Sequence, residues 1–383
     1  MNNKISSRGA LSAIALAALC LPHLLMAADP VGTTPVGYNE VVALGDSDTR
    51  FSVPLHRAAV FLGTVKLLGG TGGSSLTVEG APAWGANTFA YAAGSQANTY
   101  YVSLATGAKA GMYYTITANS ADTLTLDLAG DTLNGTGGVQ PGNELAIIPY
   151  WTLTTLFPGQ QGITGTTSAG GSGAATKILF ANNSTAGINL SPSTGYFYYT
   201  GAGGTGPSWR RAGSGATRLD DEVLYPDSYI VIRQDGIGTS TLLSATGTVA
   251  LGERKYVLGT LAPDTAQDNA IAIEVAVPMT LAQSRLFESG AFEGTSSAGG
   301  AGGGDRLLAF DDLAAAYNKS PSAIYFYYTG TGGGGPSWRR SGTGVTNMNT
   351  EPVFQPGKGY VIRKAAKPQA GTQIWALTPP YAD

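Results

Sequence analysis

A stretch of 21 residues decides the organisation of this chain because it occurs twice, as SPSTGYFYYTGAGGTGPSWRR at residues 191–211 and as SPSAIYFYYTGTGGGGPSWRR at residues 320–340. The two copies are 129 residues apart, and this spacing is far longer than the period of a solenoid repeat. The chain therefore contains an internal duplication of a whole module.

Further matches extend the duplication. Asn189 corresponds to Asn318 at the same spacing, and a Val-Ile-Arg motif recurs at a spacing of 130, at residues 231–233 and 361–363. In each copy, the Tyr-Phe-Tyr-Tyr and Ser-Trp-Arg-Arg segments are predicted to form a hairpin around a Gly-rich loop, because glycine permits the positive φ angles that chain reversal needs. With the Val-Ile-Arg segment as a third strand, each copy predicts an antiparallel β module.

Strand signals also dominate the first half of the chain. Short runs rich in β-branched and aromatic residues, separated by Gly, Asn, Asp or Pro, occur at residues 50–55, 99–104, 113–118, 123–127 and 144–151. One short helix is predicted at residues 310–317, where Asp311 and Asp312 suit a helix N-terminus. We therefore predict an all-β fold, with an N-terminal β barrel or sandwich at residues 29–157 and two related antiparallel β modules at 158–260 and 261–383.

The first 28 residues have the pattern of a secretory signal peptide. Lys4 and Arg8 precede an apolar run at residues 10–21, and the small pair Ala27-Ala28 follows. The apolar run is shorter than the 20 or so residues that cross a membrane as a helix, so no transmembrane anchor is expected. The sequence predicts an exported protein that is periplasmic, on the cell surface or extracellular.

Composition narrows the classes of partner. The net charge is −3, and only 12% of the residues are charged, whereas there are 55 Gly, 20 Pro and 19 Tyr. This balance gives no electrostatic reason to expect nucleic acid or an anionic membrane as a partner. The single cysteine, Cys20, lies in the predicted signal peptide, so no disulfide is expected in the exported chain.

The segment Gly45-Asp46-Ser47 resembles the nucleophile block of the GDSL-type esterases and lipases. Those enzymes also need an Asp-x-x-His block near the C-terminus, because the serine requires an imidazole to accept its proton. The chain has only two histidines, His23 in the predicted signal peptide and His56. An esterase using Ser47 is therefore the least favoured hypothesis, and a strand end followed by a polar turn is favoured.

Metal and cofactor predictions are few. One histidine and no cysteine in the exported chain cannot build an imidazole or thiolate site. Calcium is the one ion left open, because carboxylates cluster in several predicted loops, although none has the spacing of a known calcium loop. Turn formation explains these clusters equally well. They comprise Asp46 with Asp48, Asp220 with Asp221 and Glu222, and Asp305 with Asp311 and Asp312.

The repeated aromatic and arginine residues are the candidate binding residues. Exposed Trp, Tyr and Arg side chains are common on surfaces that bind sugars or proteins. The alternative is that both tryptophans belong to the core of their sheets, with Arg211 and Arg340 stacked beside them. The candidates are Tyr196, Tyr198, Trp209 and Arg211 in the first copy and Tyr325, Tyr327, Trp338 and Arg340 in the second.

Three motifs together resemble an uncharacterised family of secreted bacterial β-rich proteins. They are a Ser-Val-Pro-Leu-His-Arg segment at 52–57, a Trp-Thr-Leu…Leu-Phe-Pro segment at 151–158, and the duplicated YFYYTG…SWRR…PGxGYVIR module. The first copy departs from the last motif, with Pro226-Asp227-Ser228-Tyr229 in place of the Pro-Gly-x-Gly turn. The resemblance implies no activity and no catalytic residues.

The residues shared by both copies include no acid and no pair of nucleophile and base. We therefore predict a non-catalytic structural or adhesive protein of the cell envelope or extracellular matrix, which associates with itself or with other envelope proteins. Sheet edges offer one route to self-association. The alternative hypothesis is a polysaccharide-binding protein that uses the repeated Trp and Tyr residues.

Overall fold

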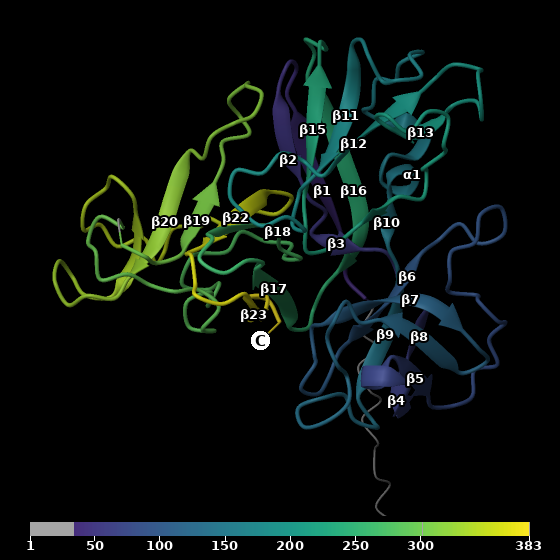
Figure 1. Ribbon diagram of the computed structural model, residues 1–383, viewed down its shortest axis with the longest axis horizontal. Coiled ribbons are helices and arrows are strands. Elements are labelled where there is room, and N and C mark those ends of the chain that lie inside the picture. The colour runs from purple at the N-terminus through teal and green to yellow at the C-terminus, as the bar shows by residue number, and fades with distance from the viewer. Residues whose placement is uncertain (1–33, 301, 383) are drawn as a thin grey trace, which may run out of the picture. The chain divides into compact units, whose positions relative to one another are not determined.

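Strands make up most of the regular secondary structure in this computed structural model, which describes residues 34–300 and 302–382 (Figure 1). This part of the chain has 23 strands and a single one-turn α-helix, α1 (Leu153–Leu156), with two short 3-10 turns, η1 (Thr71–Gly73) and η2 (Pro158–Gln160). The predicted all-β fold is confirmed. The signal peptide predicted at residues 1–28 lies outside the described residues.

A closed six-stranded barrel forms in the first half of the chain. Its strands, in order around the barrel, are β4 (Phe61–Gly69), β5 (Ser75–Val78), β8 (Thr123–Asp127), β7 (Tyr113–Asn119), β6 (Tyr100–Leu104) and β9 (Glu144–Pro149). Side chains alternate along β8, where Leu124 and Leu126 are buried while Thr125 and Asp127 are exposed, because successive side chains point to opposite faces of a strand. The inward-facing apolar side chains form one core.

Each copy of the duplicated stretch lies in a five-stranded antiparallel sheet. The first sheet has the order β13 (Ser208–Arg211), β12 (Thr194–Tyr199), β11 (Ala175–Phe180), β15 (Ile230–Asp235) and β2 (Asp48–Phe51). The second has the order β21 (Ser337–Arg340), β20 (Ala323–Tyr328), β19 (Arg306–Ala309), β22 (Gly359–Lys364) and β18 (Gln267–Ala272). Tyr198 pairs with Trp209, and Tyr327 with Trp338, so both predicted hairpins are confirmed.

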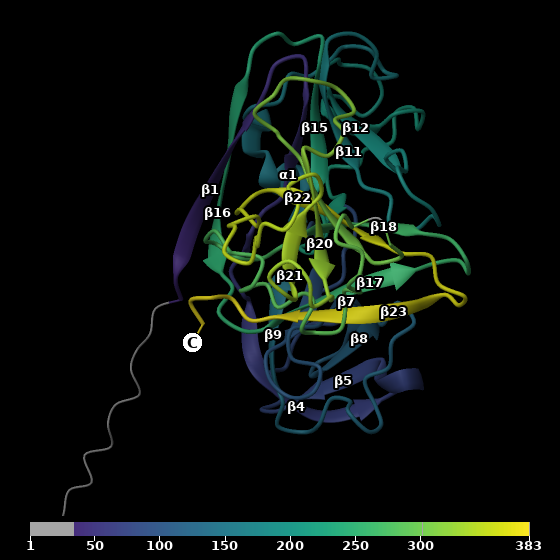
Figure 2. The same cartoon turned by 90° about the vertical axis from the view of Figure 1, so that its left-hand side faces the viewer.

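A second layer of strands packs against each five-stranded sheet. The first layer has the order β1 (Val36–Ala43), β16 (Thr241–Val249) and β3 (Leu55–His56), and the second consists of β17 (Arg254–Thr260) and β23 (Gly371–Leu377). Two short strands, β10 (Trp151–Thr152) and β14 (Val223–Leu224), form a separate pair. Figure 2 shows β1 and β16 running side by side. The apolar side chains between the layers form one core in each copy.

The strand pairings do not follow the domain boundaries predicted from sequence, which were residues 29–157, 158–260 and 261–383. Strand β2 pairs with β15 as β18 pairs with β22, and β1 pairs with β16 as β17 pairs with β23. Strands β1 to β3 therefore belong to the first copy, and the barrel is inserted within it. We call residues 61–149 the barrel, residues 35–60 with 150–250 module 1, and residues 251–382 module 2.

The segment predicted as a helix at 310–317 is a loop, and this prediction was wrong. Its backbone groups bond to module 1 instead of to one another. The Ala316 carbonyl accepts from Asp48 N at 2.9 Å, and Asn318 N donates to Asp48 Oδ2 at 2.7 Å. Asn318 has a φ of 49°, which asparagine tolerates better than most residues. Contact between the modules therefore replaces the hydrogen bonds that a helix would have made.

The two modules contact each other reciprocally. In module 1, Arg233 donates to both oxygens of Asp48, at 2.7 and 2.8 Å, and to Asn318 of module 2 at 2.7 Å. The same triad recurs with the modules exchanged: Arg363 donates to both oxygens of Asp268, at 2.7 and 2.9 Å, and to Asn189 of module 1 at 2.8 Å. Equal contacts with exchanged partners define an isologous interface, such as that of a two-fold dimer. The two modules are thus paired as the subunits of a homodimer would be.

Candidate functional site

The repeated tryptophans are core residues. Trp209 and Trp338 are each 1% exposed, and each packs against the tyrosine opposite, Tyr198 or Tyr327, with ring centroids 5.6 and 5.5 Å apart. Tyr196 and Tyr325 are also buried. A polysaccharide surface built on these tryptophans is therefore not present, and the alternative of core packing is the one that the structure adopts.

The arginine that stacks on an aromatic ring is the first of each Arg-Arg pair. Arg210 lies 3.6 Å from the ring centroid of Tyr199, and Arg339 lies 3.7 Å from that of Tyr328. Both guanidinium groups are buried and donate to carbonyls of the Gly-rich loop that joins the hairpin strands. Arg211 and Arg340 are exposed, so the expectation that they stack on the tryptophans was wrong. The first arginine of each repeated pair therefore holds the Gly-rich loop of its own hairpin in place.

Three of the carboxylates considered for calcium form ion pairs within the protein. Asp48 is held by Arg233, Asp220 by Arg218 and Asp305 by Lys364. Within the described ranges, no three His, Cys, Asp or Glu side chains gather as metal ligands would. These carboxylates therefore form ion pairs within the protein, and the clusters give no positive support for a calcium site.

Ser47 is completely buried and takes part in the contact between modules. Its hydroxyl donates to the Ala316 carbonyl at 3.1 Å and accepts from Ala316 N at 3.0 Å. At the equivalent place in the other half, the side chain of Gln267 accepts from Gly187 N at 3.2 Å. Ser47 therefore performs a structural task that is repeated in both halves, and no substrate can reach its oxygen.

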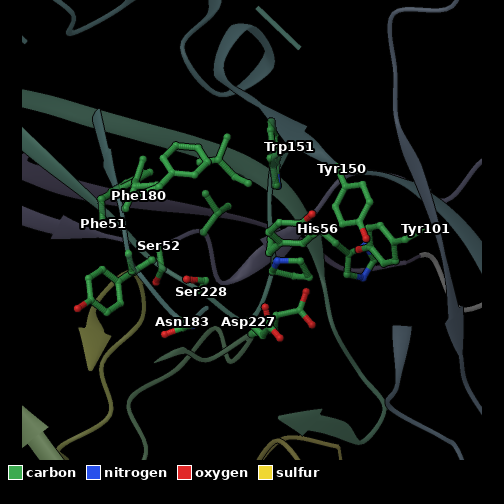
Figure 3. A pocket seen from close by; sticks show the side chains of 18 of the residues that line it. Phe51, Ser52, His56, Tyr101, Tyr150, Trp151, Phe180, Asn183, Asp227 and Ser228 are labelled. Atoms are coloured by element: carbon green, nitrogen blue, oxygen red, sulfur yellow. The ribbon is translucent and has the colours of Figure 1, made fainter. Parts of the chain in front are cut away.

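A pocket of about 410 Å³ lies where the barrel and both modules meet (Figure 3). Aromatic rings contribute much of its wall. They are those of Tyr101 from the barrel and of Phe51, Tyr150, Trp151, Phe180, Tyr225 and Tyr229 from module 1. In Figure 3 the phenylalanines lie on one side of the pocket and Tyr101 and Tyr150 on the other, with Trp151 and His56 between them. The pocket also has a polar edge, formed by Ser52, Asn183, Asp227 and Ser228.

His56 is the only histidine among the described residues, and it belongs to this pocket. Its Nδ1 lies 2.9 Å from the carbonyl of Arg57, so Nδ1–H donates and Nε2 is left as an acceptor when the ring is neutral. Burial lowers the pKa of His56, which favours the neutral ring at physiological pH.

Asp227 supplies the carboxyl group of the polar edge. It accepts a hydrogen bond from the Tyr113 hydroxyl at 2.8 Å. Burial nevertheless raises the pKa of Asp227, because removal from water penalises the charged form more than this bond stabilises it. A second carboxylate of the wall, Glu274, is paired with Arg254 at 3.0 Å. The wall also contains one cation, Arg57, which donates to Asn98 Oδ1 at 2.8 Å and to the Tyr150 carbonyl at 3.1 Å.

The hydrogen bonds of His56 bear on one kind of chemistry, that of a Ser-His pair. Among the described residues, His56 makes no hydrogen bond to a serine or to a carboxylate, so the pocket holds no activated nucleophile of the Ser-His kind. A concave pocket with several aromatic side chains and a few polar groups is the usual form of a small-molecule site.

Sequence reasoning missed this site, although one signal for it was present. Asp227 and Ser228 occupy the turn at which the first copy departs from the Pro-Gly-x-Gly pattern of the second, Pro356-Gly357-Lys358-Gly359. The pocket is also formed by segments from three parts of the chain, so no local pattern describes it.

Comparison with known proteins places the chain in no group. No protein-family model matches it, and neither a curated protein nor a solved structure matches it significantly. The resemblance to secreted bacterial β-rich proteins therefore stays a prediction. No helix in the described part of the chain is both long and apolar enough to cross a membrane.

Proposed function

We propose that the protein is an exported, non-catalytic binding protein of the cell envelope or extracellular matrix, and that its pocket takes one or two sugar units of a neutral glycan. The observation that carries the proposal is the combination of two accessible rings, the partly exposed Trp151 and the 52% exposed Tyr225, with the polar edge of Asp227 and Ser228 in one cavity. Aromatic rings suit the apolar faces of a sugar ring, and the polar edge suits its hydroxyl groups.

The size and charge of the pocket support this ligand class. A volume of about 410 Å³ falls in the range of about 300 to 1,000 Å³ that is typical of small-molecule sites. Burial favours the neutral ring of His56 and raises the pKa of Asp227, and Arg57 already donates to Asn98 and to the Tyr150 carbonyl. The hydroxyl groups of a neutral sugar suit these donors and acceptors. Export rests on the sequence of residues 1–28 alone.

A glycan array tests the proposal. Ser184 is an exposed residue of the pocket wall, so Ser184→Trp should fill the pocket without disturbing a core. Thr185 is exposed but does not line the pocket, and Thr185→Trp is the matched control. We expect binding to at least one neutral glycan that is lost in Ser184→Trp and kept in Thr185→Trp. Absence of binding to every glycan, or equal binding by both variants, contradicts the proposal.

A structural or adhesive role through self-association is the second candidate. Within residues 34–300 and 302–382, strand β1 pairs with β16 alone, which leaves its other edge for another strand. Val36 and Tyr38 on β1 are 68% and 74% exposed, and Leu242 on β16 is 52% exposed. Pairing of β1 with β1 of a second copy would extend the sheet and place these apolar side chains beside those of the partner strand.

Sedimentation velocity tests the second candidate over a range of protein concentrations. We expect a concentration-dependent dimer that disappears in Tyr38→Lys, because an edge lysine opposes strand addition. Leu62→Lys, at an exposed residue of the barrel, is the control and should still associate. A monomer at all concentrations contradicts this role and leaves the sugar proposal unaffected.

A further inference from the structure

Three cations surround one carboxylate at the contact between the modules. Asp312 Oδ1 lies 3.7 Å from Arg50 Nη1 and 3.8 Å from Lys319 Nζ, and Asp312 Oδ2 lies 3.5 Å from Lys358 Nζ. The side chains of Arg50, Lys319 and Asp312 are 10%, 5% and 2% exposed. Of the other carboxylates nearby, Asp48 is held by Arg233, and Asp311 accepts from the backbone N of Leu313. The cluster of Arg50, Lys319, Lys358 and Asp312 therefore has three positive charges and only one negative charge.

Several donors of this group have no acceptor among the described residues. They are Nε and Nη1 of Arg50 and Nζ of Lys319. Asp312 gives these donors an ion pair beyond hydrogen-bond distance, and the Arg50 guanidinium stacks 3.3 Å from the ring centroid of Phe310. A buried charged donor that lacks a hydrogen bond is still unfavourable, because it has lost its water. Burial also lowers the pKa of Lys319. Both side chains line a cavity of about 580 Å³ at the contact between the modules. Because the free donor atoms lie beneath the cavity wall, an anion in the cavity binds them when the two side chains turn towards it.

The other half of the interface shows that these charges are not needed to join the modules. Asn183, the counterpart of Asp312 in the duplication, exchanges two hydrogen bonds of 2.8 Å with the backbone of Ala270, as Asp312 accepts from the backbone N of Arg50 at 3.2 Å. The counterparts of the four charged residues in that half are all neutral. They are Ala270 for Arg50, Asn183 for Asp312, Leu190 for Lys319 and Ser228 for Lys358.

We propose that this charged half of the interface is an oxyanion site, in which Arg50 and Lys319 bind a carboxylate, sulfate or phosphate group, with Lys358 adding charge. Guanidinium and ammonium groups are the usual partners of such anions. The site is distinct from the neutral pocket, and its ligand does not depend on the sugar proposal. An inorganic anion and the acid group of an acidic sugar have the same chemistry at this site.

Isothermal titration calorimetry at constant ionic strength tests the site with three probes, namely sulfate, phosphate and glucuronate, with chloride as the background salt. We expect saturable binding of at least one probe to the whole protein. Glucuronate binding much more tightly than phosphate would assign the cavity to acidic sugars, and comparable binding would assign it to a free anion. No saturable binding of any probe at millimolar concentration overturns the proposal.

Variants that copy the neutral half provide the controls. Lys319→Leu and Arg50→Ala should each weaken binding about tenfold or more, because each removes a charge-assisted hydrogen bond. Asp312→Asn should tighten binding, because it removes the competing carboxylate and keeps the shape that Asn183 has in the other half. Lys177→Leu, at a surface pair with Asp235, should have no effect. Equal affinity in Lys319→Leu, Asp312→Asn and the unmodified protein overturns the proposal even if Arg50→Ala fails to fold.

Discussion

Removal of one carboxylate from the interface tests the reciprocal contact between the modules. In Asp48→Ala, Arg233 loses both oxygens that it binds at 2.7 and 2.8 Å, and Asn318 N loses its acceptor. The side chains of Asp48 and Arg233 are 6% and 25% exposed, so the variant leaves a partly buried guanidinium with Asn318 as its remaining partner. Loss of one member of a buried ion pair costs about 3–5 kcal/mol. We therefore expect a loss towards the lower end of the range for a buried ion pair.

The duplication supplies a second variant with the same expectation. Asp268→Ala removes the equivalent carboxylate, which Arg363 binds at 2.7 and 2.9 Å. Because its side chain is 13% exposed, we expect a loss at the lower end of the same range. Asp235→Ala is the control, since Asp235 is 40% exposed beside Lys177, and an exposed pair contributes at most about 1 kcal/mol.

Urea unfolding, followed by near-ultraviolet circular dichroism, measures the free energy of unfolding of all three variants. A lower midpoint at an unchanged slope reports a loss of stability alone. The interface variants should lose several times as much as the control. Losses below about 1 kcal/mol in both Asp48→Ala and Asp268→Ala would refute the interface as a main source of stability.

Three other variants give predictions of different kinds. Trp338→Ala and Trp209→Ala should each lower the free energy of unfolding by about 3–5 kcal/mol, the usual cost of a large core truncation; urea midpoints within error of the unmodified protein would place these rings on the surface. The raised pKa of Asp227 means that its contribution to stability is present at low pH and is lost as pH rises through the folded-state pKa. Asp227→Asn should therefore be more stable than the unmodified protein at pH 7 and should lose that advantage near pH 3, as thermal unfolding at both pH values will show. Arg339→Leu should expose the loop at residues 330–336 to proteolysis, and an unchanged digestion pattern would mean that stacking on Tyr328 does not hold it.

Much of the fold could be predicted because the duplication and the strand alternation are local patterns. The hairpins of both copies and most barrel strands occur where residue types indicate them. The extent of module 1 could not be predicted, because β2 pairs with β15 across 185 residues of sequence at Asp48 and Arg233. The Ala-rich segment at 310–317 has helix formers, yet its contacts with Asp48 stabilise an extended loop instead.

The candidate site was less accessible to sequence reasoning than the fold. Aromatic residues at 209 and 338 attract attention because they recur, but recurrence here marks the core and the Gly-rich loop that both copies need. The pocket and the charged cluster use residues at which the copies differ, such as Asp227, Ser228 and Arg50. In a duplicated chain, shared residues therefore report the scaffold, and differences between the copies direct attention to possible sites.

Fluorine NMR of protein labelled with 5-fluorotryptophan tests the central claim most directly. The chain has five tryptophans, and Trp→Phe variants assign their five resonances. Of these residues, Trp151 lines the pocket, whereas Trp209, Trp338 and Trp375 are buried in the module cores. Addition of a neutral glycan selected by the array should shift the Trp151 resonance and leave those of Trp209 and Trp338 in place. A shift confined to Trp209 or Trp338, with Trp151 unchanged, would contradict the account.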